Sequence, residues 1–97
     1  MTVILHPGAE QDLIEAALFY EREGSPTLAA RFVTEFRRVA SLIGEHPDIG
    51  PSRGKGLRGV TMAGFPYTVI YRHNANQIKI LVVKHDRRRA GHGSRRS

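Results

Sequence analysis

The sequence lacks cysteine, and it lacks long apolar runs. Without cysteine, neither disulfide bonds nor thiolate metal ligands can hold the fold together. No apolar run approaches the roughly 20 residues that a membrane helix needs. The start of the chain lacks the basic segment and the longer apolar stretch of a signal peptide. These absences, with a length of 97 residues, predict a soluble cytoplasmic protein of one domain.

Acidic residues are almost absent from the second half of the chain. Residues 1–50 contain four Lys or Arg and eight Asp or Glu, which gives a net charge of −4. Residues 51–97 contain eleven Lys or Arg and a single acid, Asp86, which gives +10. This asymmetry predicts an acidic partner, which is either a nucleic acid or an acidic protein.

A short strand and an amphipathic helix are predicted first. Residues 2–6 form a β-branched run that stops at Pro7, where the helix is expected to begin. Its first turn contains Glu10 and Asp12, acids that suit the positive end of the helix dipole. The expected apolar face of this helix comprises Leu13, Ile14, Ala17, Leu18 and Tyr20.

The second helix is predicted from its cap and its apolar stripe. Gly24 can end the first helix in the left-handed conformation, Ser25 can cap the next one, and Pro26 fits its first turn. The stripe comprises Leu28, Phe32, Phe36, Val39 and Ile43. The side expected to face solvent comprises Arg31, Glu35 and Arg38. With so short a connection, the two helices are expected to form an αα-hairpin.

Three further strands are predicted in the second half. A loop of glycines, prolines and bases covers residues 47–59. The segments 59–62, 66–73 and 77–85 then have strand-like patterns separated by turns. Apolar residues occupy most of both faces of the last strand, which is therefore expected at the centre of the sheet.

The expected fold class is α+β, in the order strand, helix, helix, strand, strand, strand. The αα-hairpin is expected to pack on one face of a twisted antiparallel sheet. The opposite face is expected to be partly open, because a domain of this size lacks a second layer to cover it. Residues 91–97 contain no apolar side chain and are expected to form a flexible basic tail.

Six short motifs occur in order along nearly the whole chain. They are "AEQDL" at residues 9–13, "FYE" at 19–21, "HPDIG" at 46–50, "LRG" at 57–59, "YTVIYR" at 67–72 and "IKILVVKHDRR" at 78–88. As an ordered set they resemble the RelE/ParE superfamily of bacterial type II toxins. The resemblance implies a single toxin domain over residues 1–90 and an antitoxin that wraps and neutralises it.

The superfamily divides by target, and the residues favour one branch. RelE-like enzymes cut mRNA on the ribosome with Lys and Arg, commonly with a Tyr or His near the end of the last strand. This chain has no tyrosine after Tyr71, and its only late acid/base candidates are His85 and His92. The motifs resemble the ParE branch more closely. The resemblance thus implies a plasmid-stabilising, non-enzymatic inhibitor of DNA gyrase, with a ribosome-dependent mRNA endonuclease as the alternative.

The candidate functional residues are mostly bases near the end of the last strand. For a gyrase inhibitor, toxicity and partner binding are expected to depend on Arg58, Arg72, His85, Arg87, Arg88 and Arg89. For a nuclease, the expected catalytic residues are His85, Arg72 and Arg88. Each of these residues also has a possible role that is purely structural. Arg58 is expected to bond loop carbonyls, His85 can pair with Asp86, and the three consecutive arginines can be a solubilising run.

The expected partners are a cognate antitoxin and DNA gyrase. We expect no membrane contact and no sequence-specific DNA binding by this chain alone. No cofactor or metal is expected, since the five histidines lack the spacing of paired ligands. Residues 50–56 superficially resemble a phosphate loop, but they lack the Gly-Lys-Ser/Thr ending.

Overall fold

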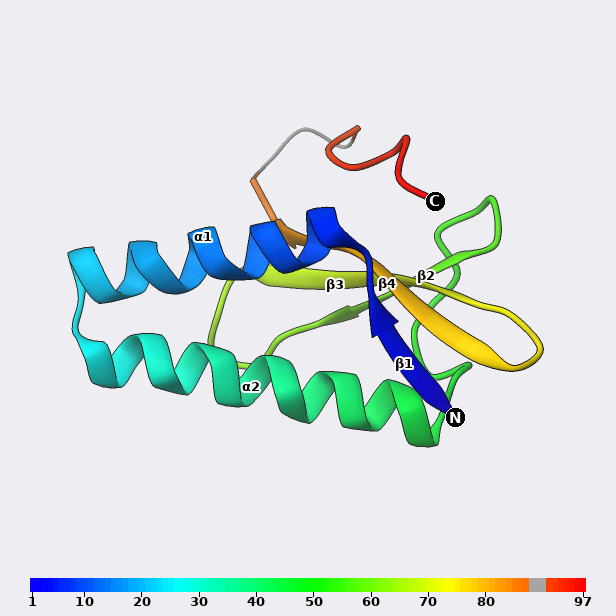
Figure 1. Ribbon diagram of the computed structural model, residues 1–97, viewed down its shortest axis with the longest axis horizontal. Coiled ribbons are helices and arrows are strands. Elements are labelled where there is room, and N and C mark those ends of the chain that lie inside the picture. Colours follow the sequence, from blue (N-terminus) through cyan, green and yellow to red (C-terminus); the bar gives the residue numbers. More distant parts are fainter. Residues whose placement is uncertain (88–90) are drawn as a thin grey trace.

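A computed structural model of the chain describes residues 1–87 and 91–97 (Figure 1). Its elements are β1 (Thr2–Leu5), α1 (Pro7–Glu23), α2 (Pro26–Glu45), β2 (Leu57–Thr61), β3 (Tyr67–His73) and β4 (Gln77–His85). The two helices form the expected hairpin on one face of a four-stranded sheet. The predicted α+β class and element order are therefore confirmed. Within the described ranges, no helix has the combination of length and apolarity that crossing a bilayer demands.

The sheet is mixed, and only three of its strands have the antiparallel pairing expected. Strand order is β1-β4-β3-β2, so β4 lies in the interior of the sheet as predicted. β2, β3 and β4 form an antiparallel meander, whereas β1 pairs with β4 in parallel. The helical hairpin explains this direction, because the end of α2 lies beside the start of β1. β2 therefore starts near the same end as β1, and two reversals make β4 parallel to β1.

A side chain caps the N-terminus of each helix. The hydroxyl of Ser25 accepts a hydrogen bond from the Leu28 N–H at 3.0 Å, which confirms the predicted cap of α2. The imidazole of His6 caps α1 in the same way, through a 2.8 Å bond from the Gly8 N–H to its Nδ1. Histidine is not among the favoured cap residues, so this role was not predictable from local sequence.

α1 is rotated relative to the face predicted for it. Its buried positions are Ala9, Asp12 and Ala16, whose small size lets the helix approach β4 closely. Ile14 and Leu18, expected in the apolar face, are 45% and 53% exposed. The prediction was wrong for these two residues because the helix packs through its smaller side chains. An apolar stripe therefore remains on the outer side of α1.

The second face of the sheet is covered, although it was expected to be partly open. Ile70, Leu81 and Val82 form a small buried cluster there. A Cβ atom added at Gly59 would lie 2.7 Å from the Cδ of Arg53, so this arginine crosses directly over the sheet. Segment 91–97 covers another part of the face. Long polar side chains and glycine-rich backbone can thus bury a few apolar residues without a second layer of helices or strands.

Glu35 ties α2 to the turn after β2, although it was expected on the solvated side. Its side chain is 12% exposed. It accepts hydrogen bonds of 2.7 and 2.8 Å from Arg38 and one of 2.6 Å from the Ala63 N–H. The hydrogen bonds from Arg38, and then the bond from Ala63, hold the pKa of Glu35 below its ordinary value.

The Glu35→Gln variant is expected to be less stable than the wild type at pH 7 by about 1 kcal/mol. A carboxyl whose pKa is lowered by folding stabilises the fold above its unfolded-state pKa of about 4.3, and this stabilisation is lost as the pH falls through the folded-state pKa. The difference between the two proteins should therefore shrink between about pH 5 and pH 3. Urea unfolding across this range measures it. Glu45→Gln, at an exposed position of α2, is the matched control, and a difference that stays constant with pH would contradict the assignment.

Candidate functional site

The loop between α2 and β2 is held by residues of two other motifs. The hydroxyl of Tyr71 donates to the carbonyl of Pro47 at 2.6 Å and accepts from the Gly50 N–H at 3.1 Å. The guanidinium of Arg58 donates to the carbonyls of Asp48 and Gly50 at 3.2 and 2.8 Å. The predicted structural role of Arg58 is therefore confirmed.

Gly50 is needed where this loop crosses the sheet. A Cβ atom at this position would lie 2.9 Å from the carbonyl oxygen of Gly59 and 3.0 Å from the hydroxyl of Tyr71. Any side chain would push the loop away from both. Three of the six sequence motifs, those containing Gly50, Arg58 and Tyr71, therefore meet in one structural unit that fixes the loop.

The predicted site residues do not form one cluster. Arg72 lies opposite Lys79, near the turn between β3 and β4, and on the face away from the helices. His85 lies opposite Tyr67 and packs edge-on against its ring, with centroids 5.1 Å apart. Tyr67 and Arg72 are five positions apart along β3, which corresponds to about 16 Å. The pair expected in a nuclease is thus split between two ends and two faces of the sheet. Two other predicted residues, Arg88 and Arg89, lie outside the described residues.

Two hydrogen bonds fix the end of β4, one within the chain end itself and one from β3. The Nδ1 of His85 accepts a 3.0 Å bond from the Arg87 N–H. Asp86 accepts a 2.8 Å bond from the hydroxyl of Thr68. The suggested pairing of His85 with Asp86 is therefore wrong, because successive residues of an extended chain point to opposite sides. Arg87 is exposed at this end, as a contact residue must be.

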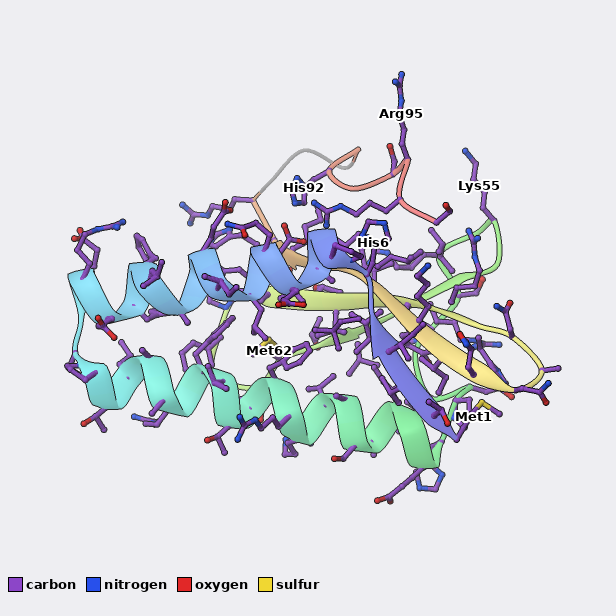
Figure 2. The ribbon with its side chains drawn as sticks, in the orientation of Figure 1. Met1, His6, Lys55, Met62, His92 and Arg95 are labelled. Carbon is purple, nitrogen blue, oxygen red and sulfur yellow. The ribbon has the colours of Figure 1, made fainter. Side chains whose placement is uncertain are left out.

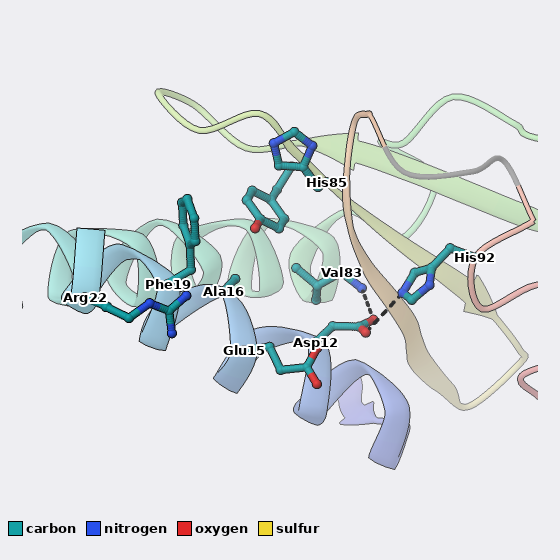
Figure 3. A pocket seen from close by; sticks show the side chains of 9 residues that line it. Asp12, Glu15, Ala16, Phe19, Arg22, Val83, His85 and His92 are labelled. Atoms are coloured by element: carbon teal, nitrogen blue, oxygen red, sulfur yellow. Dashed lines mark hydrogen bonds and ion pairs between the residues drawn. The ribbon is translucent and has the colours of Figure 1, made fainter. Parts of the chain in front are cut away.

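A cavity of about 240 Å³ opens between α1 and the end of β4 (Figure 3). The side chains that give it its chemical character are Asp12, Glu15, Arg22, Tyr67, His85 and His92. In Figure 3 the carboxylate of Asp12 points toward the main chain of Val83 and the ring of His92. The Val83 N–H donates to Asp12 at 3.1 Å, and the Nε2 of His92 lies 3.2 Å from its other oxygen.

The lining of this cavity argues against a phosphate-binding catalytic site. The cavity is lined by the carboxylates of Asp12 and Glu15 and the guanidinium of Arg22, and Asp12 is paired with Arg96, so the lining offers a phosphate group no excess of positive charge. His85 and His92 both line the cavity, but Arg72 lies at the far end of β3. Among residues 1–87 and 91–97, no three side chains of the metal-ligating types lie together. The cavity therefore suits a polar packing role better than phosphoryl chemistry.

A two-helix hairpin on a four-stranded sheet of this kind defines a known class of small α+β proteins. One solved structure, described as the chromosomal ParDE TA system from P. aeruginosa, matches with a TM-score of 0.78 over 88% of this chain and 95% of that chain. At 22% identity this likeness concerns the fold. The model of the family described as "ParE toxin of type II toxin-antitoxin system, parDE" matches residues 3–90, so the chain belongs to this family. A comparison with curated proteins found no match.

Proposed function

We propose that this ParE-family toxin inhibits DNA gyrase without being an enzyme, by trapping the cleaved DNA intermediate, and that a cognate antitoxin neutralises it. The family match over residues 3–90 carries the proposal. The separation of Arg72 from His85 also favours it, because an mRNA endonuclease would need bases and an acid/base group around one phosphate. Acting on gyrase, the toxin would work in the cytoplasm, and with its antitoxin it would stabilise a plasmid that encodes both.

Two surfaces suit the two proposed partners. The half of the chain after residue 50 carries a net charge of +10, and a gyrase complex with cleaved DNA presents phosphates to such a surface. The outer side of α1 exposes Ile14 and Leu18, which lie four residues apart on the same side of the helix. An exposed apolar stripe of this kind suits a segment of the antitoxin that folds on binding.

A supercoiling and cleavage assay with purified protein and gyrase tests the proposal, beside an mRNA cleavage assay on translating ribosomes. The expected result is lost supercoiling, accumulated linear DNA and intact mRNA. Cut mRNA with unaffected gyrase would overturn the proposal in favour of the nuclease. No effect in either assay would also overturn it, leaving the chain as an inactive partner of its antitoxin.

The Arg87→Glu variant is expected to weaken gyrase inhibition by about tenfold or more, because a reversed charge meets like charge at the interface. Arg87 is exposed, and its side chain is therefore free to change without disturbing the core. Arg31→Glu changes the charge equally at an exposed position of α2 and is the matched control. Half-maximal inhibitory concentrations in the supercoiling assay compare the two. Equal losses would show that net charge alone matters and that the end of β4 is not the contact surface.

A further inference from the structure

The edge of β4 is open beyond the end of β1. β1 pairs with β4 only as far as Ile80. On the other side, the register with β3 passes from Tyr71 opposite Ile80 to Ile70 opposite Val82, so Leu81 is the extra residue of a β-bulge. Main-chain groups at this point lose their usual partners in the sheet. Because they are buried, they need others.

Asp12 and Arg96 supply those partners. The carboxylate of Asp12 accepts from the Val83 N–H at 3.1 Å, and the guanidinium of Arg96 donates to the Leu81 carbonyl at 3.1 Å. Arg96 also binds Asp12 with two hydrogen bonds, of 2.6 and 3.3 Å. Asp12 is 8% exposed, and His92 contacts it from the same segment. One charge-assisted pair thus joins α1, the edge of β4 and segment 91–97.

Segment 91–97 covers the second face of the sheet from this anchor. Gly93 has a φ of +74°, and a Cβ atom there would lie 2.6 Å from a methyl group of Val82. Val82 is 3% exposed beneath it. Farther along, the amino group of Lys79 donates to the main-chain oxygen of Ser97 at 2.7 Å. The segment therefore hides an apolar side chain and occupies a base of the same face.

The segment was expected to be a flexible tail because it has no apolar side chain. Apart from the packing of Gly93 on Val82, the contacts described for it are polar. Its sequence, "GHGSRRS", adds no apolar side chain to either core cluster. Its attachment therefore depends mainly on the pair between Arg96 and Asp12, which can break without exposing apolar surface of the segment itself. We propose that residues 91–97 form a reversible latch that closes over the second face of the sheet and exposes Val82 and Lys79 when it opens. Opening and closing of the latch involve only this chain. The proposal therefore does not depend on whether gyrase is the target.

Thiol labelling tests the latch, because the chain contains no cysteine of its own. In the Val82→Cys variant, the thiol lies beneath Gly93 and reacts only when the latch opens. Adding Arg96→Gln is expected to raise the labelling rate under native conditions by about tenfold or more, since charge-assisted hydrogen bonds are lost. Arg95→Gln is the matched control. It removes the same charge one residue away, and Figure 2 shows Arg95 pointing away from the protein.

A second thiol distinguishes latch opening from loss of the whole fold. Val39 on α2 is fully buried in the main core, so the thiol of the Val39→Cys variant reports global unfolding. Arg96→Gln should leave its labelling slow while it accelerates that of the Val82→Cys variant. If both thiols accelerate together, the segment is a fixed part of the fold and the latch is refuted. Equal labelling of the Val82→Cys variant with Arg95→Gln and with Arg96→Gln would refute it as well.

Discussion

Replacing Phe32 by alanine is expected to lower the free energy of unfolding by about 4 kcal/mol. The side chain is fully buried. Its ring centroid lies 5.2 Å from that of Tyr20, 5.2 Å from that of Phe65 and 5.0 Å from that of Tyr67. The variant loses apolar burial and leaves a cavity where α1, α2 and the sheet meet. Since small domains have total stabilities of about 5–15 kcal/mol, this substitution removes a large part of the free energy of unfolding. Urea unfolding measures the loss.

Phe19→Ala is the control for this substitution. Phe19 also belongs to the aromatic group, with its ring centroid 5.4 Å from that of Tyr20, but it is 44% exposed. We expect a loss below about 1 kcal/mol there, because little apolar area leaves the interior. Phe32→Leu fills most of the cavity and should cost less than Phe32→Ala. Similar losses for Phe19→Ala and Phe32→Ala would show that the aromatic group is not the centre of the core.

Much of the fold follows from local signals in the sequence. Ser25 and Pro26 mark the start of α2 because capping depends on residues a few positions apart. The stripe containing Phe32 marks the buried side of α2 because the helical period places its members on one face. These features require no knowledge of the rest of the molecule, and the structure has them where they were predicted.

Features that depend on contacts between elements far apart in the sequence were not predictable from local signals. Asp12 was predicted to be a first-turn acid, but α1 begins at Pro7 and Glu10 is the acid of its first turn. Asp12 lies on the side of α1 that packs against β4, so its carboxylate turns inward to the Val83 N–H. The distance between Arg72 and His85 depends on strand register, which places them at opposite ends of β3 and β4. Likewise, Tyr71 is fully buried, but the strand pattern of β3 has no feature that indicates the loop to which its hydroxyl binds.

Tyr71→Phe is expected to lower the free energy of unfolding by about 2–3 kcal/mol, which is large for the loss of one oxygen atom. The hydroxyl donates to the Pro47 carbonyl and accepts from the Gly50 N–H, and the Tyr71 side chain is fully buried. Its removal leaves two main-chain groups without that partner in a place with little access to water. Urea unfolding measures the loss, and hydrogen exchange should show the Gly50 amide exchanging faster. Tyr20→Phe, at a half-buried tyrosine whose pKa is raised by burial, is the control, with an expected loss below about 1 kcal/mol.

The same loop allows the two possible roles of Arg58 to be separated. Arg58 and Tyr71 both bind main-chain groups of Gly50, so Arg58→Gln and Tyr71→Phe should be non-additive in stability by about 0.5 kcal/mol or more. If Arg58 serves only to hold the loop, Arg58→Gln and Tyr71→Phe should weaken gyrase inhibition in proportion to their losses of stability. A much larger functional loss for Arg58→Gln would instead show that its guanidinium also contacts the target. Because Tyr71 is fully buried and cannot reach a partner, its variant calibrates what loosening the loop alone does to activity.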